Sequence, residues 1–131
     1  MKTIFCTISF ALAFLITNAQ QASLTIQNYS QRFMTVKVMR TVQGVSSLHE
    51  TVTISAHNST TVYFEKTGYY FTKTKAVLSK KNPVYQKGKP FHVTNDDTGY
   101  SEITLTFSIE ESNIPQVTGG KQISKAEFDK N

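Results

Sequence analysis

Apolar and polar residues alternate along much of this chain, and a period of two is the pattern of a β-strand with one buried face. The clearest alternation runs over residues 101–109, and a second one runs over residues 33–41. The apolar residues that we assign to the inner faces of these two strands are Ile103, Leu105, Phe107, Ile109, Met34, Val36 and Val38. We expect the strand at 101–109 to be central in its sheet or to pair with the opening strand region.

Three runs rich in Val, Ile, Thr, Tyr and Phe occupy residues 52–54, 60–65 and 69–78. Such residues suit a pleated, half-buried surface. Turn-like segments at 56–59 and 66–68 separate the runs. We therefore predict three consecutive antiparallel strands, on which the rest of the chain packs.

The long run at 69–78 has two different faces. Tyr70 begins one face, which continues with threonine, alanine and leucine, whereas Lys73 and Lys75 lie on the other. Lysines are almost never fully buried without a partner, so we place the two lysines outside and the Tyr70 face inside. The spacing Tyr-x-Thr-x-Thr-x-Ala resembles the strand near the end of fibronectin type III and related immunoglobulin-like sandwiches, although the tryptophan of that family is missing. The resemblance implies a small-residue inner stripe that a tyrosine opens.

Shorter runs predict further strands at 24–27 and 91–94, and the alternation extends the strand at 52–54 back to Leu48. Residues 43–47, which contain Gly44 and two serines, are typical of a loop. The chain then has about seven strands and no convincing internal helix. We predict an all-β fold, a single antiparallel immunoglobulin- or fibronectin-III-like β-sandwich over residues 20–112, with a small barrel as the alternative.

The first nineteen residues have the composition of a secretory signal peptide. Lys2 supplies the positive start, residues 4–16 are mostly apolar, and Thr17 and Ala19 are small residues at the cleavage site. We expect cleavage after Ala19, a secreted or periplasmic location, and no membrane span once the peptide has been removed. The only cysteine, Cys6, lies within the peptide, so the mature chain has no disulfide and no thiolate metal site.

The charge of the chain is mildly basic. Its 14 Lys and Arg outnumber its 9 Asp and Glu. This balance allows attraction to a polyanion such as an acidic polysaccharide, but it indicates no specific nucleic acid. An envelope protein is the other partner that we consider.

One surface stripe is our candidate ligand-binding site. Tyr69, Phe71, Lys73 and Lys75 would lie in a row on the outer face of the long strand. Aromatic rings beside cations can stack on a sugar and pair with its anionic groups. The alternative is that the aromatic rings cover a neighbouring strand while the lysines are solvated.

Other chemistry has little support in the sequence. Three imidazoles can hold zinc, but the spacing of His49, His57 and His92 is no metal signature. The acidic turn around Asp96 and Asp97 lacks the regular ligands of a calcium loop, and ordinary turn chemistry explains it. No nucleophile elbow, zinc-protease motif or phosphate loop is present. We predict a non-enzymatic protein without a cofactor or a metal.

The composition changes beyond Glu110, and residues 113–131 have the composition of a linker and a tail. Ser124 and Glu127 have the spacing of a capping box, yet a helix this short is marginal alone. We expect a flexible tail, with a peptide that folds on a partner as the alternative.

The chain as a whole resembles the small secreted proteins of the Bacteroidetes type, through a signal peptide that ends in Thr-Asn-Ala-Gln-Gln and a cysteine-free β-domain. This resemblance implies the envelope or the exterior and supplies no activity. The function that we predict is a binding or interaction module. The alternative is a structural or assembly subunit that pairs through strand edges or the C-terminal tail.

Overall fold

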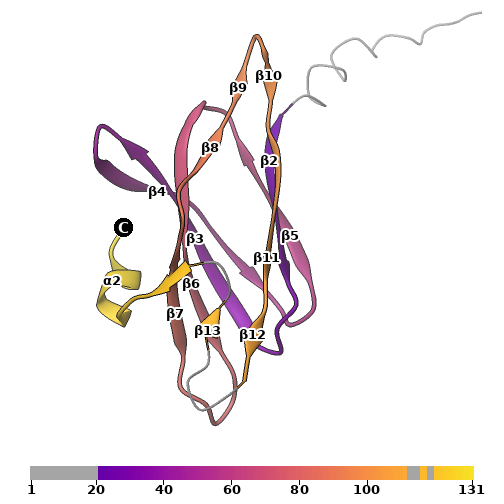
Figure 1. Ribbon diagram of the computed structural model, residues 1–131, viewed down its shortest axis with the longest axis vertical. Coiled ribbons are helices and arrows are strands. Elements are labelled where there is room, and N and C mark those ends of the chain that lie inside the picture. The colour runs from indigo at the N-terminus through magenta and orange to yellow at the C-terminus, as the bar shows by residue number, and fades with distance from the viewer. Residues whose placement is uncertain (1–20, 112–115, 118–119) are drawn as a thin grey trace, which may run out of the picture.

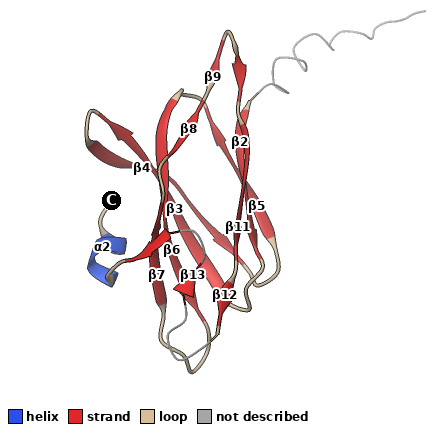
Figure 2. Cartoon of the chain, viewed as in Figure 1, coloured by secondary structure: helices blue, strands red, loops and turns tan. Residues whose placement is uncertain are grey.

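A computed structural model describes residues 21–111, 116–117 and 120–131. The described chain is almost entirely β-structure, with one short helix near its end (Figure 2). The all-β expectation is therefore confirmed. The predicted signal peptide at 1–19 lies outside the described residues, as does most of the segment expected to be a linker.

The larger sheet has six strands and carries most of the candidate surfaces (Figure 1). Five of the strands follow one another in the order β14, β7, β6, β3, β4, and the sixth, β8, pairs with β6 beside β7. Their bounds are β3 Phe33–Val42, β4 Val45–Ile54, β6 Gly68–Val77, β7 Val84–Gly88, β8 Phe91–Val93 and β14 Gly120–Gln122. The strand pairs in this sheet are antiparallel.

The smaller sheet has three strands in the order β11, β2, β5. Their bounds are β2 Ala22–Asn28, β5 Ser59–Phe64 and β11 Glu102–Phe107. The expectation that the last long strand pairs with the opening strand is confirmed, since β11 pairs with β2. That pair is parallel, however, which corrects the expectation of a purely antiparallel fold.

Short pairs complete the described β-structure. The strands β9 (Asn95–Asp96) and β10 (Gly99–Tyr100) form a hairpin, and β12 (Ile109–Glu110) pairs with β13 (Gln116–Val117). These brief strands are the reason that the described chain has more strands than the seven or so expected.

The hydrophobic core draws side chains from both sheets. The buried members are Ala22, Leu24, Ile26, Val62, Phe64 and Phe107 from the smaller sheet, and Met34, Val36, Val38, Ile54, Tyr70, Ala76, Val84 and Val93 from the larger one. The predicted inner faces of the strands at 33–41 and 69–78 are therefore correct. Each strand alternates because its opposite face points away from this core.

The strands expected at 52–54, 60–65 and 69–78 are present, but they do not pair with one another, so the expected antiparallel pairing was wrong. The strand β4 pairs with β3, β5 pairs with β2, and β6 pairs with β3. The chain passes from the larger sheet to the smaller one after β4 and returns after β5. Strand propensity predicts which residues form strands, but it does not predict which sheet each strand belongs to.

The segment at 43–47 is not a loop, because the chain turns over only two residues between β3 and β4. Gln43 and Gly44 have φ values of 52° and 80°. Two positive φ values in a two-residue connection are the signature of a type I′ turn, whose twist matches that of the flanking strands.

The C-terminal residues pack on the larger sheet, which corrects the expectation of a flexible tail. The strand β14 pairs with β7, and the helix α2 (Lys125–Asp129) lies beside β6 and β7. Phe128 is the buried residue of α2, and its ring lies 5.6 Å from that of Tyr85. The expected cap is present, since the Glu127 amide donates to Ser124 Oγ at 3.1 Å.

Candidate functional site

The predicted stripe on the long strand lies on the outer face of β6, but most of it is covered. Tyr69 is 59% exposed and its ring lies 4.8 Å from that of His92. Phe71 is buried, with the Lys87 ammonium 4.8 Å from its ring centroid. Lys73 is only 3% exposed, whereas Lys75 is half-buried. The stripe therefore points away from the core as predicted, but the expectation that Lys73 is exposed was wrong.

The backbone of the C-terminal segment covers Lys73. Its ammonium donates to the carbonyl oxygens of Glu127 at 2.8 Å and Lys130 at 2.6 Å. The Glu127 carboxylate lies 3.9 Å away. Burial lowers the pKa of Lys73, the Glu127 carboxylate acts in the opposite direction, and the neighbouring Lys37 ammonium lowers the pKa further. A ligand could therefore reach Lys73 only if the C-terminal segment moved away from it.

An open pocket lies at the other end of β6, beside β4. It encloses about 250 Å³ and is lined by Arg40, Ser47, Leu48, His49, Glu65, Lys66 and Tyr70. This volume is slightly below the range for drug-sized ligands, which begins at about 300 Å³. The pocket can therefore hold a side chain or a single sugar-sized group.

A β-bulge in β4 places His49 at this pocket. Val38 pairs with Glu50 and Met39 pairs with Leu48, so His49 is an extra residue without a partner in β3. A bulge redirects the side chain of its extra residue. The His49 ring stacks on Phe64 at 4.9 Å, and its Nε2 lies 2.9 Å from the Tyr63 carbonyl oxygen.

Arg40 contributes a cation with unused hydrogen-bonding capacity to the same pocket. Its Nε is buried and has no hydrogen-bond partner among the described residues. A guanidinium offers donors in a fixed fork that matches a carboxylate. Arg40 is not among the site residues predicted from the sequence, although its position gives a signal, because Arg40 continues the inner-face series of Met34, Val36 and Val38. A charged residue at an inner-face position is unusual, so it identifies a candidate site residue.

The strand β4 forms an edge of the larger sheet, next to this pocket. It ends the strand order, and residues 45–51 are all exposed. Figure 1 shows its hairpin turn standing out from the body of the molecule. Soluble proteins usually protect edge strands with lysine, proline or a bulge. This strand contains the bulge at His49 but no lysine and no proline.

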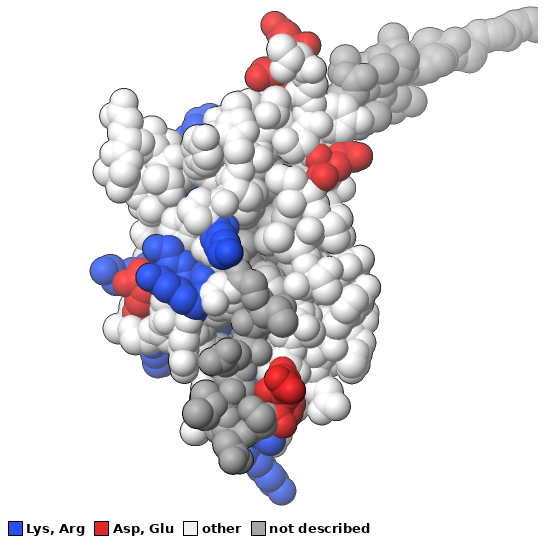
Figure 3. Space-filling view, viewed as in Figure 1, with Lys and Arg blue, Asp and Glu red and all other residues white. Residues whose placement is uncertain are grey.

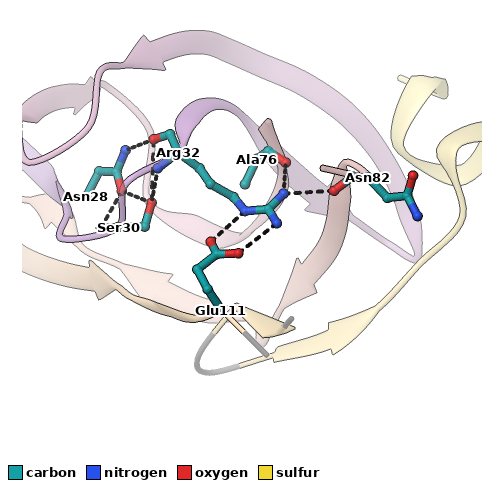
Figure 4. Close-up of polar contacts among 6 residues, drawn as sticks. All are labelled: Asn28, Ser30, Arg32, Ala76, Asn82 and Glu111. Atoms are coloured by element: carbon teal, nitrogen blue, oxygen red, sulfur yellow. Dashed lines mark hydrogen bonds and ion pairs between the residues drawn. The ribbon is translucent and has the colours of Figure 1, made fainter. Parts of the chain in front are cut away.

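A buried polar network joins the ends of several strands, and its role is structural (Figure 4). The Arg32 side chain is fully buried, and its Nε and Nη2 donate to the Glu111 carboxylate at 2.8 and 3.0 Å. Its Nη1 donates to the carbonyl oxygens of Ala76 at 3.2 Å and Asn82 at 2.8 Å. The paired Arg32 guanidinium holds the pKa of Glu111 below its usual value.

Asn28 and Ser30 complete this network at the turn between β2 and β3. The Asn28 amide donates to the Arg32 carbonyl oxygen at 2.8 Å, and its Oδ1 accepts from Ser30 Oγ at 2.7 Å. Because these groups are buried and already paired, the network offers no surface to a ligand.

The histidines and the acidic turn do not assemble a metal site in the part of the chain that the structure describes. No group of three or more His, Cys, Asp or Glu is suitably placed there. His57 occupies a turn with a φ of 63°, His92 lies against Tyr69, and His49 lies at the pocket. The Asp96 carboxylate accepts hydrogen bonds from the amide and hydroxyl of Thr98, which lower the pKa of Asp96.

Comparison with protein families and with curated proteins gives no match. No protein-family model matches the chain, and no curated protein matches it. Among the residues that the structure describes, no helix is long and apolar enough to cross a membrane.

Proposed function

We propose that this chain is a non-enzymatic interaction module of the cell envelope or exterior, which docks an extended, acidic segment of an envelope protein along β4. In this proposal residues 1–19 direct secretion, and the domain is an immunoglobulin-like sandwich. The shared core of the two sheets supports the sandwich assignment. Exported protein would then begin at Gln20, which N-terminal sequencing would read.

The observation that carries the proposal is the open edge of β4. A peptide that adds a strand to a sheet gains main-chain hydrogen bonds along the edge. The exposed stretch at 45–51 provides such an edge, and Val45 and Leu48 expose apolar surface along it. Apart from His49, Glu50 is the single acidic or basic residue of this stretch, and a long edge with so little charged protection is a cost to a soluble protein unless another chain uses it.

The pocket beside β4 supplies specificity. In strand addition, pockets that accept alternate side chains select the partner's sequence. The lining brings two cations, Arg40 and Lys66, against one carboxylate, Glu65, and this balance favours an anionic group. Such a pocket selects an Asp or Glu side chain of the docked strand.

A second candidate function is assembly of copies of this chain, in which two β4 edges pair with each other. The observation that favours it is the exposed apolar tip of the hairpin, formed by Val42 and Val45. A symmetric dimer would bury this tip on both sides of a two-fold axis.

The test is selection of peptides from a random displayed library on the purified full chain. We expect enriched peptides to alternate β-branched or aromatic residues with polar ones and to carry an Asp or Glu. The variant Arg40→Gln should still enrich extended peptides but lose the preference for acidic ones. Adding lysine to the edge with Val45→Lys and Thr51→Lys should abolish enrichment. The control Thr104→Lys places a lysine on an exposed position of β11 in the other sheet, and it is compared with each edge substitution made singly.

Sedimentation of the same proteins separates the two candidates. A dimer that Val45→Lys dissociates, together with a library that yields no peptide, would replace partner docking by self-assembly. Peptides that bind the edge variants as well as they bind the unmodified chain would overturn the use of β4 altogether.

A further inference from the structure

Four lysines lie side by side across the outer face of the larger sheet. In the strand register Lys37 is opposite Lys73, Lys73 is opposite Lys87, and Lys87 is opposite Lys121. We call these four residues the lysine row. Neighbouring strands are about 4.8 Å apart, and like charges directly opposite each other are destabilising. Figure 3 shows basic side chains gathered around α2 and the strands beside it.

The C-terminal segment provides oxygen atoms to Lys37 and Lys73, at one end of this row. Besides the two carbonyl oxygens on Lys73, the Lys37 ammonium donates to the carbonyl oxygens of Phe128 at 2.9 Å and Asp129 at 3.3 Å, and to Asn131 Oδ1 at 2.9 Å. The last carbonyl groups of a helix have no partner within the helix and carry partial negative charge. The segment therefore presents to the lysine row the kind of oxygens that an anion would present.

Only a small number of contacts attach this segment to the sheet. The helix α2 has five residues, fewer than an isolated helix needs to be stable in water. Phe128 is its buried residue, and the Lys37 ammonium lies 4.8 Å from the Phe128 ring. A competing anion would have to displace the Phe128 side chain, the Glu127 carboxylate beside Lys73, and the carbonyl contacts of Lys37 and Lys73.

We propose that the lysine row is a binding site for a linear anionic polysaccharide, and that residues 124–131 occupy this site in the present structure and leave when the polysaccharide binds. Carboxylate or sulfate oxygens carry full charge, so their hydrogen bonds to ammonium groups are stronger than those of carbonyl oxygens. The row is a narrow line across the strands, which fits a single chain rather than a flat membrane. This site lies on a different face from the core-facing Arg40 and does not depend on peptide docking along β4.

The experiment measures binding of the full chain to a polyuronate, to heparin as a sulfated chain, and to neutral dextran, at low and moderate salt. We expect both acidic chains to bind, more weakly as salt increases, and dextran not to bind. Phe128→Ala loosens the segment and keeps every lysine, so it should bind several-fold more tightly. The pair Lys87→Gln with Lys121→Gln should bind several-fold more weakly, and the control Lys80→Gln, which alters an exposed turn lysine, should bind almost normally.

Hydrogen exchange of the same samples tests the displacement itself. With polyuronate bound, the amides of residues 125–130 should exchange faster, while those of β3 and β6 should not. Unchanged affinity in Phe128→Ala, or equal binding by the lysine variants and the control, would overturn the proposal. Binding to anionic vesicles without binding to either acidic polysaccharide would assign the row to a membrane surface instead. Binding of heparin alone would show that the site requires sulfate groups. Binding of both heparin and polyuronate would show that negative charge is sufficient for binding.

Discussion

At the residue scale, the pair of Arg32 and Glu111 is the most demanding feature of the fold. The Arg32 side chain is fully buried and Glu111 is 21% exposed, so the guanidinium depends on this carboxylate for its countercharge. Removing one partner of a buried pair costs about 3–5 kcal/mol, and the partial exposure of Glu111 favours the lower end. We predict that Glu111→Gln lowers the free energy of unfolding by about 3 kcal/mol in urea titrations.

The neighbouring residue offers a matched control for this substitution. Glu110 is exposed, so Glu110→Gln should change the free energy of unfolding by less than about 0.5 kcal/mol. Equal effects of the two substitutions would contradict the structural role of the buried pair.

The same pair makes stability depend on pH in the acid range. Because the pKa of Glu111 is lower in the folded state, the unfolded chain binds a proton more readily. The contribution is fully present above the ordinary glutamate pKa of about 4.3 and is lost as pH falls through the lowered folded value. We predict that the difference in melting temperature between the natural chain and Glu111→Gln shrinks steadily below about pH 4. A difference that stays constant down to acid pH would show that the carboxylate charge is not the cause.

Single residues also mark the limit of reasoning from the sequence. The rarity of buried lysines predicts that Lys73 is exposed, yet its ammonium is buried by a segment more than fifty residues away in the chain. Alternation correctly gave the direction of the side chain, but it contains no information on what covers the outer face. Arg32 and Arg40 occupy the positions that flank the alternating apolar series of β3, so parity alone marks both as inward-pointing charges.

At the element scale, the two-residue turn between β3 and β4 determines how β4 is positioned at the edge of the larger sheet. Gly44 has a φ of 80°, and no atom outside its chain neighbours lies within 4 Å of an added Cβ. A non-glycine residue in left-handed backbone costs about 1–2 kcal/mol, so Gly44→Ala should destabilise the protein by about 1 kcal/mol through strain alone. Thermal unfolding measures this. Val45→Ala, on an exposed neighbour, should have little effect, and a comparable loss there would refute the explanation.

The cap of α2 gives a prediction about local rather than global stability. Ser124 accepts the Glu127 amide, and loss of such a cap costs about 1 kcal/mol. Because α2 is a peripheral element, Ser124→Ala should speed amide exchange at 125–130 and leave the melting temperature unchanged. Ser124→Thr keeps the cap and should exchange as the natural chain does. A fall in melting temperature with Ser124→Ala would mean that α2 unfolds together with the sheets.

Element positions were easier to predict from the sequence than their partners. The capping-box spacing identified the start of α2, but its length argued for a flexible tail, because the contacts of Phe128 and the two lysines cannot be seen along the chain. The bulge at His49 was missed for a related reason. An extra residue in β4 is defined only by its register against β3, and periodicity within β4 does not reveal that register.

At the scale of the whole molecule, the sequence predicted the class of fold and the main core faces, but it did not predict the topology. The paths from β4 to β5 and from β5 to β6 change sheets, and the parallel pairing of β11 with β2 joins distant parts of the chain. The changes of sheet and the parallel pair both depend on how the two sheets pack against each other. Local sequence patterns do not contain that information.

The measurement that tests the central claim most directly is amide hydrogen exchange of the full chain with and without an acidic, extended peptide. If β4 docks a partner strand, exchange should slow within residues 45–51 and stay unchanged in β11, one of the two edge strands of the other sheet. Protection confined to β11, or a bound peptide that protects neither edge, would contradict the use of β4 as the docking strand.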